Sequence, residues 1–127
     1  MNTPKPGQAV RGSQTGRPIM ALLDLLGRRW ALRMIWELRG AALSFRELRE
    51  RCDNMSPTVL NQRLRELRDT HIIEMGLAGG YSLSPAGQTL VKAMLPLLAW
   101  SEEWQQMLAA SDKVDGVDDP DQSEEQR

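Results

Sequence analysis

The chain has 127 residues, of which 41% are hydrophobic and 26% are charged, with a formal net charge of −1 at pH 7. This length fits one domain with a modest core, and no apolar run reaches the ~18 residues that a membrane span needs. The start of the chain lacks the apolar stretch of a signal peptide, and a single cysteine excludes an intrachain disulfide. We therefore expect a cytoplasmic protein without a membrane partner.

The charge is distributed unevenly along the chain. Residues 111–127 hold seven acidic and two basic side chains, whereas residues 28–69 hold ten arginines and six acidic side chains, a net of +4. An arginine-rich segment suits phosphates and base edges, because the guanidinium group donates two hydrogen bonds side by side. The same pattern is also typical of solvated helix faces with ion pairs at i,i+4. The acidic balance of the whole chain therefore does not exclude a nucleic-acid partner.

The first part of the chain predicts an arm and two helices. Residues 1–17 are rich in Pro, Gly, Gln and Thr, so we expect a flexible arm that either has no role or lies on phosphates. A helix is predicted over residues 18–26, with proline at its start and glycine after its end. Its apolar stripe is Ile19, Leu22, Leu23 and Leu26. A second helix is predicted over residues 30–39, and its candidate buried face is Trp30, Met34, Ile35 and Leu38.

Two helix-start signals mark the middle of the chain, after a linker or very short strand at residues 41–43. Ser44 and Glu47 have the spacing of a capping box. Ser56 and Pro57 combine a serine N-cap with proline at the first helical position. These signals predict a helix over residues 45–52, a short turn, and a second helix that ends near Asp69. Two short helices joined by such a turn form the helix-turn-helix pattern.

A β-hairpin is predicted directly after this unit. Residues 72–75 and 81–83 read as two strands around a glycine turn at residues 76–80. A helix-turn-helix followed by a hairpin is a winged helix, which suits the placing of one helix in the DNA major groove. The turn carries no basic residue, so we expect a structural wing that makes at most backbone contacts.

The second helix of the helix-turn-helix has an apolar side and a polar side. Leu60, Leu64 and Leu67 repeat at i, i+4 and i+7 and should face the core. Amide side chains pair with adenine edges and arginine pairs with guanine, and the start of a recognition helix enters the groove most deeply. The predicted base-reading residues are Thr58, Asn61, Gln62 and Arg65. The alternative is the solvated side of an ordinary amphipathic helix.

Phosphate contacts are predicted for the arginines around this unit and for the helix start at Ser56, since such contacts set affinity and docking register. The predicted residues are Arg28, Arg29, Arg46, Arg49, Ser56 and Arg68. For each arginine the alternative is a solvated surface position.

Ser84 and Pro85 mark the start of a long helix that should reach about Ala109, with a bend or one lost hydrogen bond at Pro96. This helix has more apolar surface than a small winged domain covers, so we expect a homodimer in which it packs with the helix at residues 18–26 across a two-fold axis. The predicted interface residues are Leu22, Leu97, Trp100 and Trp104. We expect one domain over residues 18–110 and a disordered acidic tail over residues 111–127.

Nothing in the sequence indicates catalysis, a metal site or a cofactor. His71 is the only histidine and should cap or lie on the surface at a helix–strand junction. Cys52 and His71 supply too few ligands for zinc, and the glycines of the wing precede no helix that would make a phosphate loop. Cys52 is expected to be a buried helix-end residue, with a redox switch as the alternative. We therefore predict that the protein is not an enzyme.

Four segments, taken in order, resemble the HxlR family of bacterial regulators, a branch of the winged-helix group that includes MarR: residues 25–30, 45–49, 56–67 and 81–87. The resemblance spans roughly residues 16–107 and implies a homodimeric DNA-binding transcription factor. Many members have a cysteine where this chain has Arg17, and some use it to sense oxidants or electrophiles. Members also usually have a longer, basic wing.

These observations predict a mainly α fold with a small β-hairpin: a winged helix-turn-helix with an added N-terminal helix and a long C-terminal dimerisation helix. The predicted function is a sequence-specific transcriptional regulator that binds double-stranded DNA as a homodimer, with the recognition helix at residues 56–69 in the major groove. Any small-molecule effector is not identified by the sequence. The alternative is a winged-helix module for protein–protein interaction, because a fold does not fix function. The neutral wing favours that alternative, and the arginine-rich side favours DNA.

Overall fold

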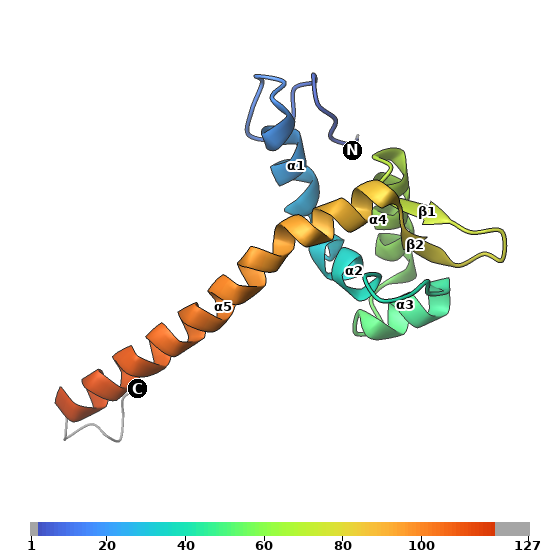
Figure 1. The fold of residues 1–127 in the computed structure, drawn as a ribbon. Coiled ribbons are helices and arrows are strands. Elements are labelled where there is room, and N and C mark those ends of the chain that lie inside the picture. Colours follow the sequence, from blue (N-terminus) through green and yellow to red (C-terminus); the bar gives the residue numbers. More distant parts are fainter. Residues whose placement is uncertain (1–2, 119–127) are drawn as a thin grey trace. The chain divides into compact units, whose positions relative to one another are not determined.

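The computed structural model describes residues 3–118 and is mainly helical (Figure 1). The elements in chain order are α1 (Pro18–Leu26), α2 (Ala31–Glu37), α3 (Phe45–Arg51), α4 (Pro57–Asp69), β1 (Ile73–Met75), β2 (Tyr81–Leu83) and α5 (Pro85–Asp118). The chain divides into two compact units between Val91 and Lys92, so the first turns of α5 belong to one unit and the rest of the helix to the other. This is the predicted winged helix-turn-helix fold.

The first two helices keep their predicted positions, but their buried faces differ in detail. In α1 the buried residues are Ala21 and Leu25, whereas Ile19 and Leu23 are more than half exposed. The predicted stripe of α1 is therefore partly an outer face. Helix α2 begins at Ala31 because Trp30 has a left-handed backbone with φ 77°. Its buried residues Met34 and Ile35 join the core together with Leu38, the C-cap residue of the helix.

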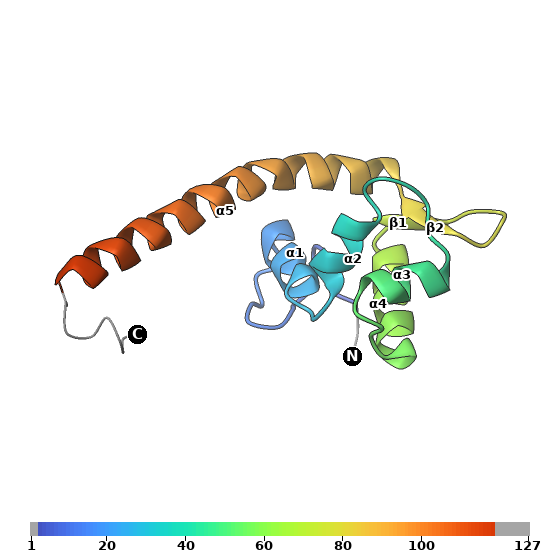
Figure 2. The same ribbon diagram turned by 90° about the horizontal axis from the view of Figure 1, so that it is seen from below.

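The helix-turn-helix is built by the two predicted caps. The Ser44 Oγ accepts from the Glu47 backbone N–H at 3.1 Å, and the Glu47 carboxylate accepts from the Ser44 N–H at 2.9 Å. At the start of α4, the Ser56 Oγ accepts from the Val59 N–H at 3.4 Å. Figure 2 shows α3 and α4 joined by the short turn between them. Asp53 and Asn54 in that turn both have positive φ angles, a conformation that these two residue types tolerate better than most.

The wing is a two-stranded antiparallel hairpin. Its register pairs Ile73 with Leu83 and Met75 with Tyr81, and Gly79 supplies a φ of +89° in the turn. Leu43 forms a bridge with Tyr81 through two backbone hydrogen bonds of 2.9 Å and 2.7 Å. The linker at residues 41–43 therefore contains an isolated bridge at Leu43 and not a strand of its own.

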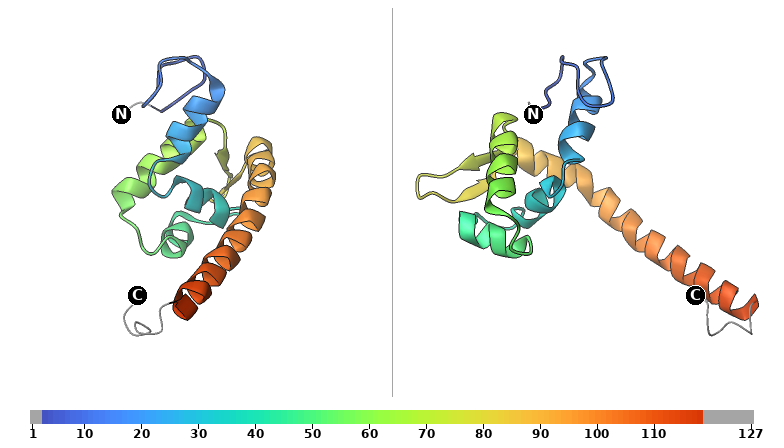
Figure 3. Two further views of the ribbon diagram at one scale, coloured as in Figure 1. Left: turned by 90° about the vertical axis from the view of Figure 1, so that its left-hand side faces the viewer. Right: turned by 180° about the vertical axis from the view of Figure 1, so that it is seen from behind.

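Helix α5 starts as predicted and runs further than predicted. The Ser84 Oγ accepts from the Gly87 N–H at 3.0 Å, and a Cβ at Gly87 would overlap the Ile72 carbonyl oxygen. Figure 3 shows the helix uninterrupted, so Pro96 removes one intrahelical N–H without ending it. Residues 111–118 belong to this helix, so α5 continues beyond the end that the sequence predicts near Ala109. The remainder of the predicted tail, residues 119–127, lies outside the described residues.

The N-terminal arm lies against α1 and the end of α4. The Gly7 N–H donates to the Gly16 carbonyl at 2.8 Å and closes a loop. The Arg11 N–H donates to the Asp24 carboxylate at 3.2 Å, and the Thr3 hydroxyl donates to the Asp69 carboxylate at 3.2 Å. These contacts give the arm a folded path over residues 3–17, while its flexibility and any DNA contact stay predictions.

No helix within residues 3–118 combines the length and the apolar character that a membrane crossing requires.

Candidate nucleic-acid interface

The polar side of α4 is one continuous outward-facing surface, which we call the reading face: Thr58, Asn61, Gln62, Arg65 and Arg68. Gln62 is half-buried and the other four are exposed. The opposite side of α4 is buried through Leu60, Leu64 and Leu67. The structure therefore brings the four predicted base-reading residues together on one side of one helix.

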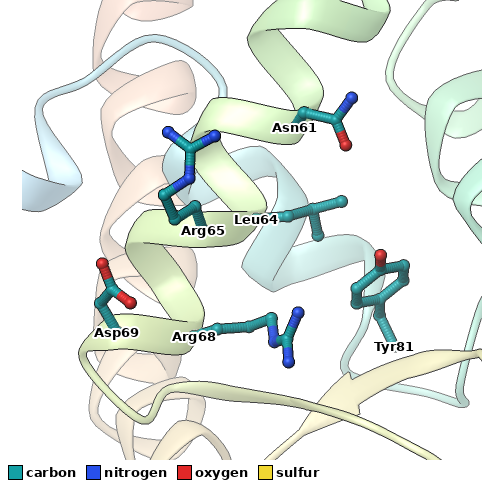
Figure 4. A pocket seen from close by; sticks show the side chains of 6 residues that line it. All are labelled: Asn61, Leu64, Arg65, Arg68, Asp69 and Tyr81. Carbon is teal, nitrogen blue, oxygen red and sulfur yellow. The ribbon is translucent and has the colours of Figure 1, made fainter.

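Two hollows border the reading face. One, of about 580 Å³, lies between α4 and β2 and is lined by Asn61, Leu64, Arg65, Arg68, Asp69 and Tyr81 (Figure 4). In that view the Arg68 side chain extends toward Tyr81. The other, of about 410 Å³, is lined by Thr58, Val59, Asn61, Gln62, Arg63 and Arg65. Asn61 and Arg65 line both hollows.

Two of the predicted base-reading residues are hydrogen-bonded to each other, and one of them, Gln62, also donates to a buried carboxylate. The Arg65 guanidinium donates to the Gln62 Oε1 at 2.8 Å. The Gln62 Nε2 donates to the Glu66 Oε2 at 2.8 Å. Glu66 is 1% exposed, so this small network connects the reading face with the interior.

Glu66 is held by two arginines. The Arg28 Nη1 donates to Glu66 Oε2 at 2.6 Å, and the Arg63 Nη1 donates to Glu66 Oε1 at 3.1 Å. Sequence reasoning missed Glu66 because its strongest partner is 38 positions away in the chain. The only local signal is its spacing of three residues from Arg63 and four from Gln62.

The prediction that Arg28 contacts phosphate is corrected by its position. Its side chain is 5% exposed and lies 3.7 Å from the Asp24 carboxylate as well as against Glu66. A guanidinium group placed in this way fastens the α1–α2 junction to α4 and is not presented to an outside ligand.

The other predicted phosphate contacts divide into exposed and internal groups. Arg29, Arg46 and Arg68 are exposed, as is Ser56 at the start of α4. Arg46 makes a surface ion pair with Glu50 at 3.3 Å, which is worth little and is readily exchanged. Arg49 is half-buried and donates to the Met55 carbonyl at 2.7 Å. It therefore holds the turn of the helix-turn-helix.

Cys52 and His71 lie where the sequence placed them. Cys52 is fully buried at the end of α3, and burial raises the pKa of its thiol, although the nearby Arg33 acts in the opposite direction. A thiol in this state is a poor nucleophile at neutral pH. His71 is exposed at the α4–β1 junction and has a φ of 61°.

The predicted dimer residues of α5 are exposed in the single chain. Leu97 is 60% exposed, Trp100 52% and Trp104 47%. The two tryptophan rings stack with their centroids 5.7 Å apart. Leu22 of α1 is half-buried. An apolar surface of this kind on a single helix indicates an interaction surface.

Comparison with known proteins matches this chain to a family of helix-turn-helix proteins and to transcriptional regulators. Residues 25–109 match the HxlR-like helix-turn-helix family. YvaP of Bacillus subtilis, an HTH-type transcriptional regulator, is 27% identical over 88 residues, which cover 65% of this chain and 82% of YvaP.

Solved structures of similar fold are regulators as well. Quinone-bound YodB of B. subtilis is 28% identical with a TM-score of 0.63, over 67% of this chain and 94% of YodB. A transcriptional regulator of the MarR family from Enterococcus faecalis is 25% identical with a TM-score of 0.66, over 78% of this chain and 96% of that protein.

Proposed function

This chain belongs to the HxlR-like helix-turn-helix family of transcriptional regulators, and from that premise we propose that it binds specific DNA sequences as a homodimer. The observation that carries the proposal is the reading face. An amide, a second amide, a hydroxyl and two guanidinium groups stand together on the outer side of α4. These are the groups that recognise base edges in the major groove.

We assign the two kinds of DNA contact to different parts of the unit. Asn61, Gln62 and Arg65 read base edges, with Thr58 at the start of the helix beside them. Arg29, Arg46 and Arg68 contact phosphates, which sets affinity and docking register without reading sequence. The backbone N–H groups at the start of α4, beside Ser56, favour a phosphate as well. Arg28 and Arg49 support this surface from within.

The uncovered residues of α5 support the proposed homodimer. Burial of Leu97, Trp100 and Trp104 against a second copy removes their apolar area from water, which is favourable by about 25 cal/mol per Å². A two-fold dimer presents two copies of α4 about 34 Å apart, one turn of DNA. We expect the binding site to be an inverted repeat, and we place the protein in the cytoplasm with the DNA.

The proposal includes no effector that acts by reacting with the Cys52 thiol. YodB is known in a quinone-bound form, but the thiol here is buried with a raised pKa. We expect Cys52 to react slowly with a thiol reagent in the native protein and rapidly in denaturant.

Selection of DNA fragments from a random pool tests the proposal. The full chain should enrich one inverted-repeat motif, and Arg65→Ala should lose preference at one base of each half-site. Arg39→Ala is the matched control, because it also removes one exposed arginine and has no assigned DNA role. Salt-sensitive binding without an enriched motif contradicts sequence recognition. No DNA binding at all would favour a module for protein–protein interaction.

A further inference from the structure

A chain of hydrogen bonds runs from the interior of the protein to the reading face. It begins at Arg28 in the α1–α2 junction, passes through the Glu66 carboxylate and the Gln62 amide, and ends at the Arg65 guanidinium. Each link is 2.6–2.8 Å long. Two of the groups that we assign to base reading are thus connected to a buried charge.

Glu66 is fixed in place more firmly than a surface residue. Because a buried carboxylate is costly unless it is paired and hydrogen-bonded, its position depends on Arg28 and Arg63. Arg63 also donates to the Arg29 carbonyl at 2.8 Å. The carboxylate is therefore tied to α4 by its own backbone and to the α1–α2 junction by both arginines.

The neighbours of Gln62 determine which way its amide points. A carboxylate only accepts hydrogen bonds and a guanidinium group only donates them. The Nε2 of Gln62 must therefore face Glu66, and the Oε1 must face Arg65. The reversed amide would place two acceptors together on one side and two donors together on the other.

We propose that Glu66 is a positioning residue for base recognition, which fixes the amide of Gln62 in one orientation and thereby sets the base that Gln62 prefers. The proposal rests on the proposed function, since it concerns the same reading face. With one N–H given to Glu66 and one lone pair given to Arg65, Gln62 keeps one donor and one acceptor. That pair complements the N7 acceptor and the N6 amino donor of adenine.

The hydrogen bond to Gln62 also restricts the orientation of the Arg65 side chain. One of its Nη1 hydrogens is given to Gln62, and the rest of its five N–H groups stay available for a guanine edge or a phosphate. Loss of Glu66 should therefore reduce discrimination at the bases read by Gln62 and Arg65. Asn61, which lies on the same helix and forms no part of the network, should keep its preference.

The test removes Arg28 and Glu66 together, because removal of either one alone would leave the other charge buried without its strongest partner. Asp24, the second carboxylate beside Arg28, still accepts from the Arg11 N–H at 3.2 Å. Arg28→Met with Glu66→Leu replaces both by apolar side chains of similar length, a change that buried pairs often tolerate. The affinities of the full chain and of this variant are measured on the selected site and on each single-base substitution of it. The expected result is a loss of about tenfold in discrimination at the position where Gln62→Ala also loses it.

Two comparisons separate positioning from general destabilisation. In a Gln62→Ala background the paired substitution should cause no further loss at that position. At the position that is sensitive to Asn61→Ala, discrimination should be unchanged. An equal loss at every position, or unchanged discrimination everywhere, overturns the proposal.

A measurement without DNA keeps the proposal testable if the variant does not fold. In the NMR spectrum of the free wild-type protein, the side-chain amide of Gln62, identified by its absence in Gln62→Ala, should be shifted and slow to exchange. Glu66→Asp, which retains the charge and withdraws it by one methylene, should abolish both features. An unshifted, rapidly exchanging Gln62 amide overturns the inference, whereas absence of any base preference in the wild type overturns the proposed function and this inference with it.

Discussion

The apolar side chains of α4 and those of the later part of α5 differ in their exposure to solvent. Leu60 and Leu67 of α4 are 0% exposed, and only the polar side of that helix reaches solvent. Leu97 and Trp100 of α5 are at least half exposed. The unit at residues 1–91 buries its own core, whereas the helix beyond it leaves its large apolar residues uncovered.

This difference separates the two partners that we assign. The first unit has a closed core of its own, and the outer side of α4 consists of groups that bind a polar, negatively charged ligand. The second has the composition of half an interface. The DNA-binding unit and the dimer surface should therefore respond differently to substitution, and the five experiments that follow probe the two parts of the molecule.

The largest effect is expected in the core of the first unit. Leu67→Ala removes a fully buried side chain and should lower the free energy of unfolding by about 2–5 kcal/mol. Leu97→Ala, the matched substitution on α5, should change it by far less in dilute solution, where the dimer is dissociated. Urea unfolding of both variants checks the contrast, and equal losses would show that the two helices are buried alike.

The next effect concerns association. Trp100→Ala with Trp104→Ala should weaken the dimer by at least about 2 kcal/mol, since central aromatic residues dominate interfaces. Sedimentation at micromolar concentration should give about twice 14.3 kDa for the wild type and the single mass for the variant. A wild-type monomer under these conditions contradicts the dimer, and a dimeric variant places the interface elsewhere.

A smaller effect is expected at the first cap of the helix-turn-helix. Ser44→Ala removes the acceptor for the Glu47 N–H and should cost about 0.5–2 kcal/mol of unfolding free energy. Thermal unfolding measures it, and Ser82→Ala, a half-buried serine of β2, serves as the control. Equal costs for the two serines would mean that the capping box adds nothing.

The same cap gives a pH dependence of known sign. Hydrogen bonds from the Ser44 backbone and side chain lower the pKa of the Glu47 carboxyl. A lowered folded-state pKa contributes stability at neutral pH, and that contribution is lost as the pH falls through the folded value. Between neutral and acid pH the wild type should therefore lose more stability than Glu47→Gln, which has no carboxyl to titrate at this cap, and parallel curves would contradict this reading.

The smallest effect is expected from the end of the sequence. Removal of residues 119–127, which hold four acidic side chains and one arginine, raises the net charge from −1 to +2 and leaves the described part of α5 in place. DNA binding should tighten modestly, and most at low salt, because charges act over about 8 Å at physiological ionic strength. Weaker binding after truncation would mean that these residues support the dimer.

Features fixed by near neighbours in the chain were predictable, and features fixed by distant ones were not. The caps at Ser44, Ser56 and Ser84 depend on a side chain and a backbone group three residues apart, so the sequence located α3, α4 and α5. The polar side of α4 followed from the spacing of its leucines. By contrast, the pairing of Arg28 with Glu66 depends on the packing of the α1–α2 junction on α4. Composition alone therefore placed Arg28 among the outward-facing arginines.

Substitution of two exposed arginines tests the central claim, that the outer side of α4 reads bases, most directly. Affinities of Arg65→Ala and Arg46→Ala are measured on the selected site, on its single-base variants and on unrelated DNA, at several salt concentrations. Arg65→Ala should lose about 1–3 kcal/mol on the selected site and relax one base position. Arg46→Ala should weaken binding to all sequences alike and reduce the salt slope by about one. An Arg65→Ala protein that keeps every base preference of the parent would contradict the assignment of α4 as the recognition helix.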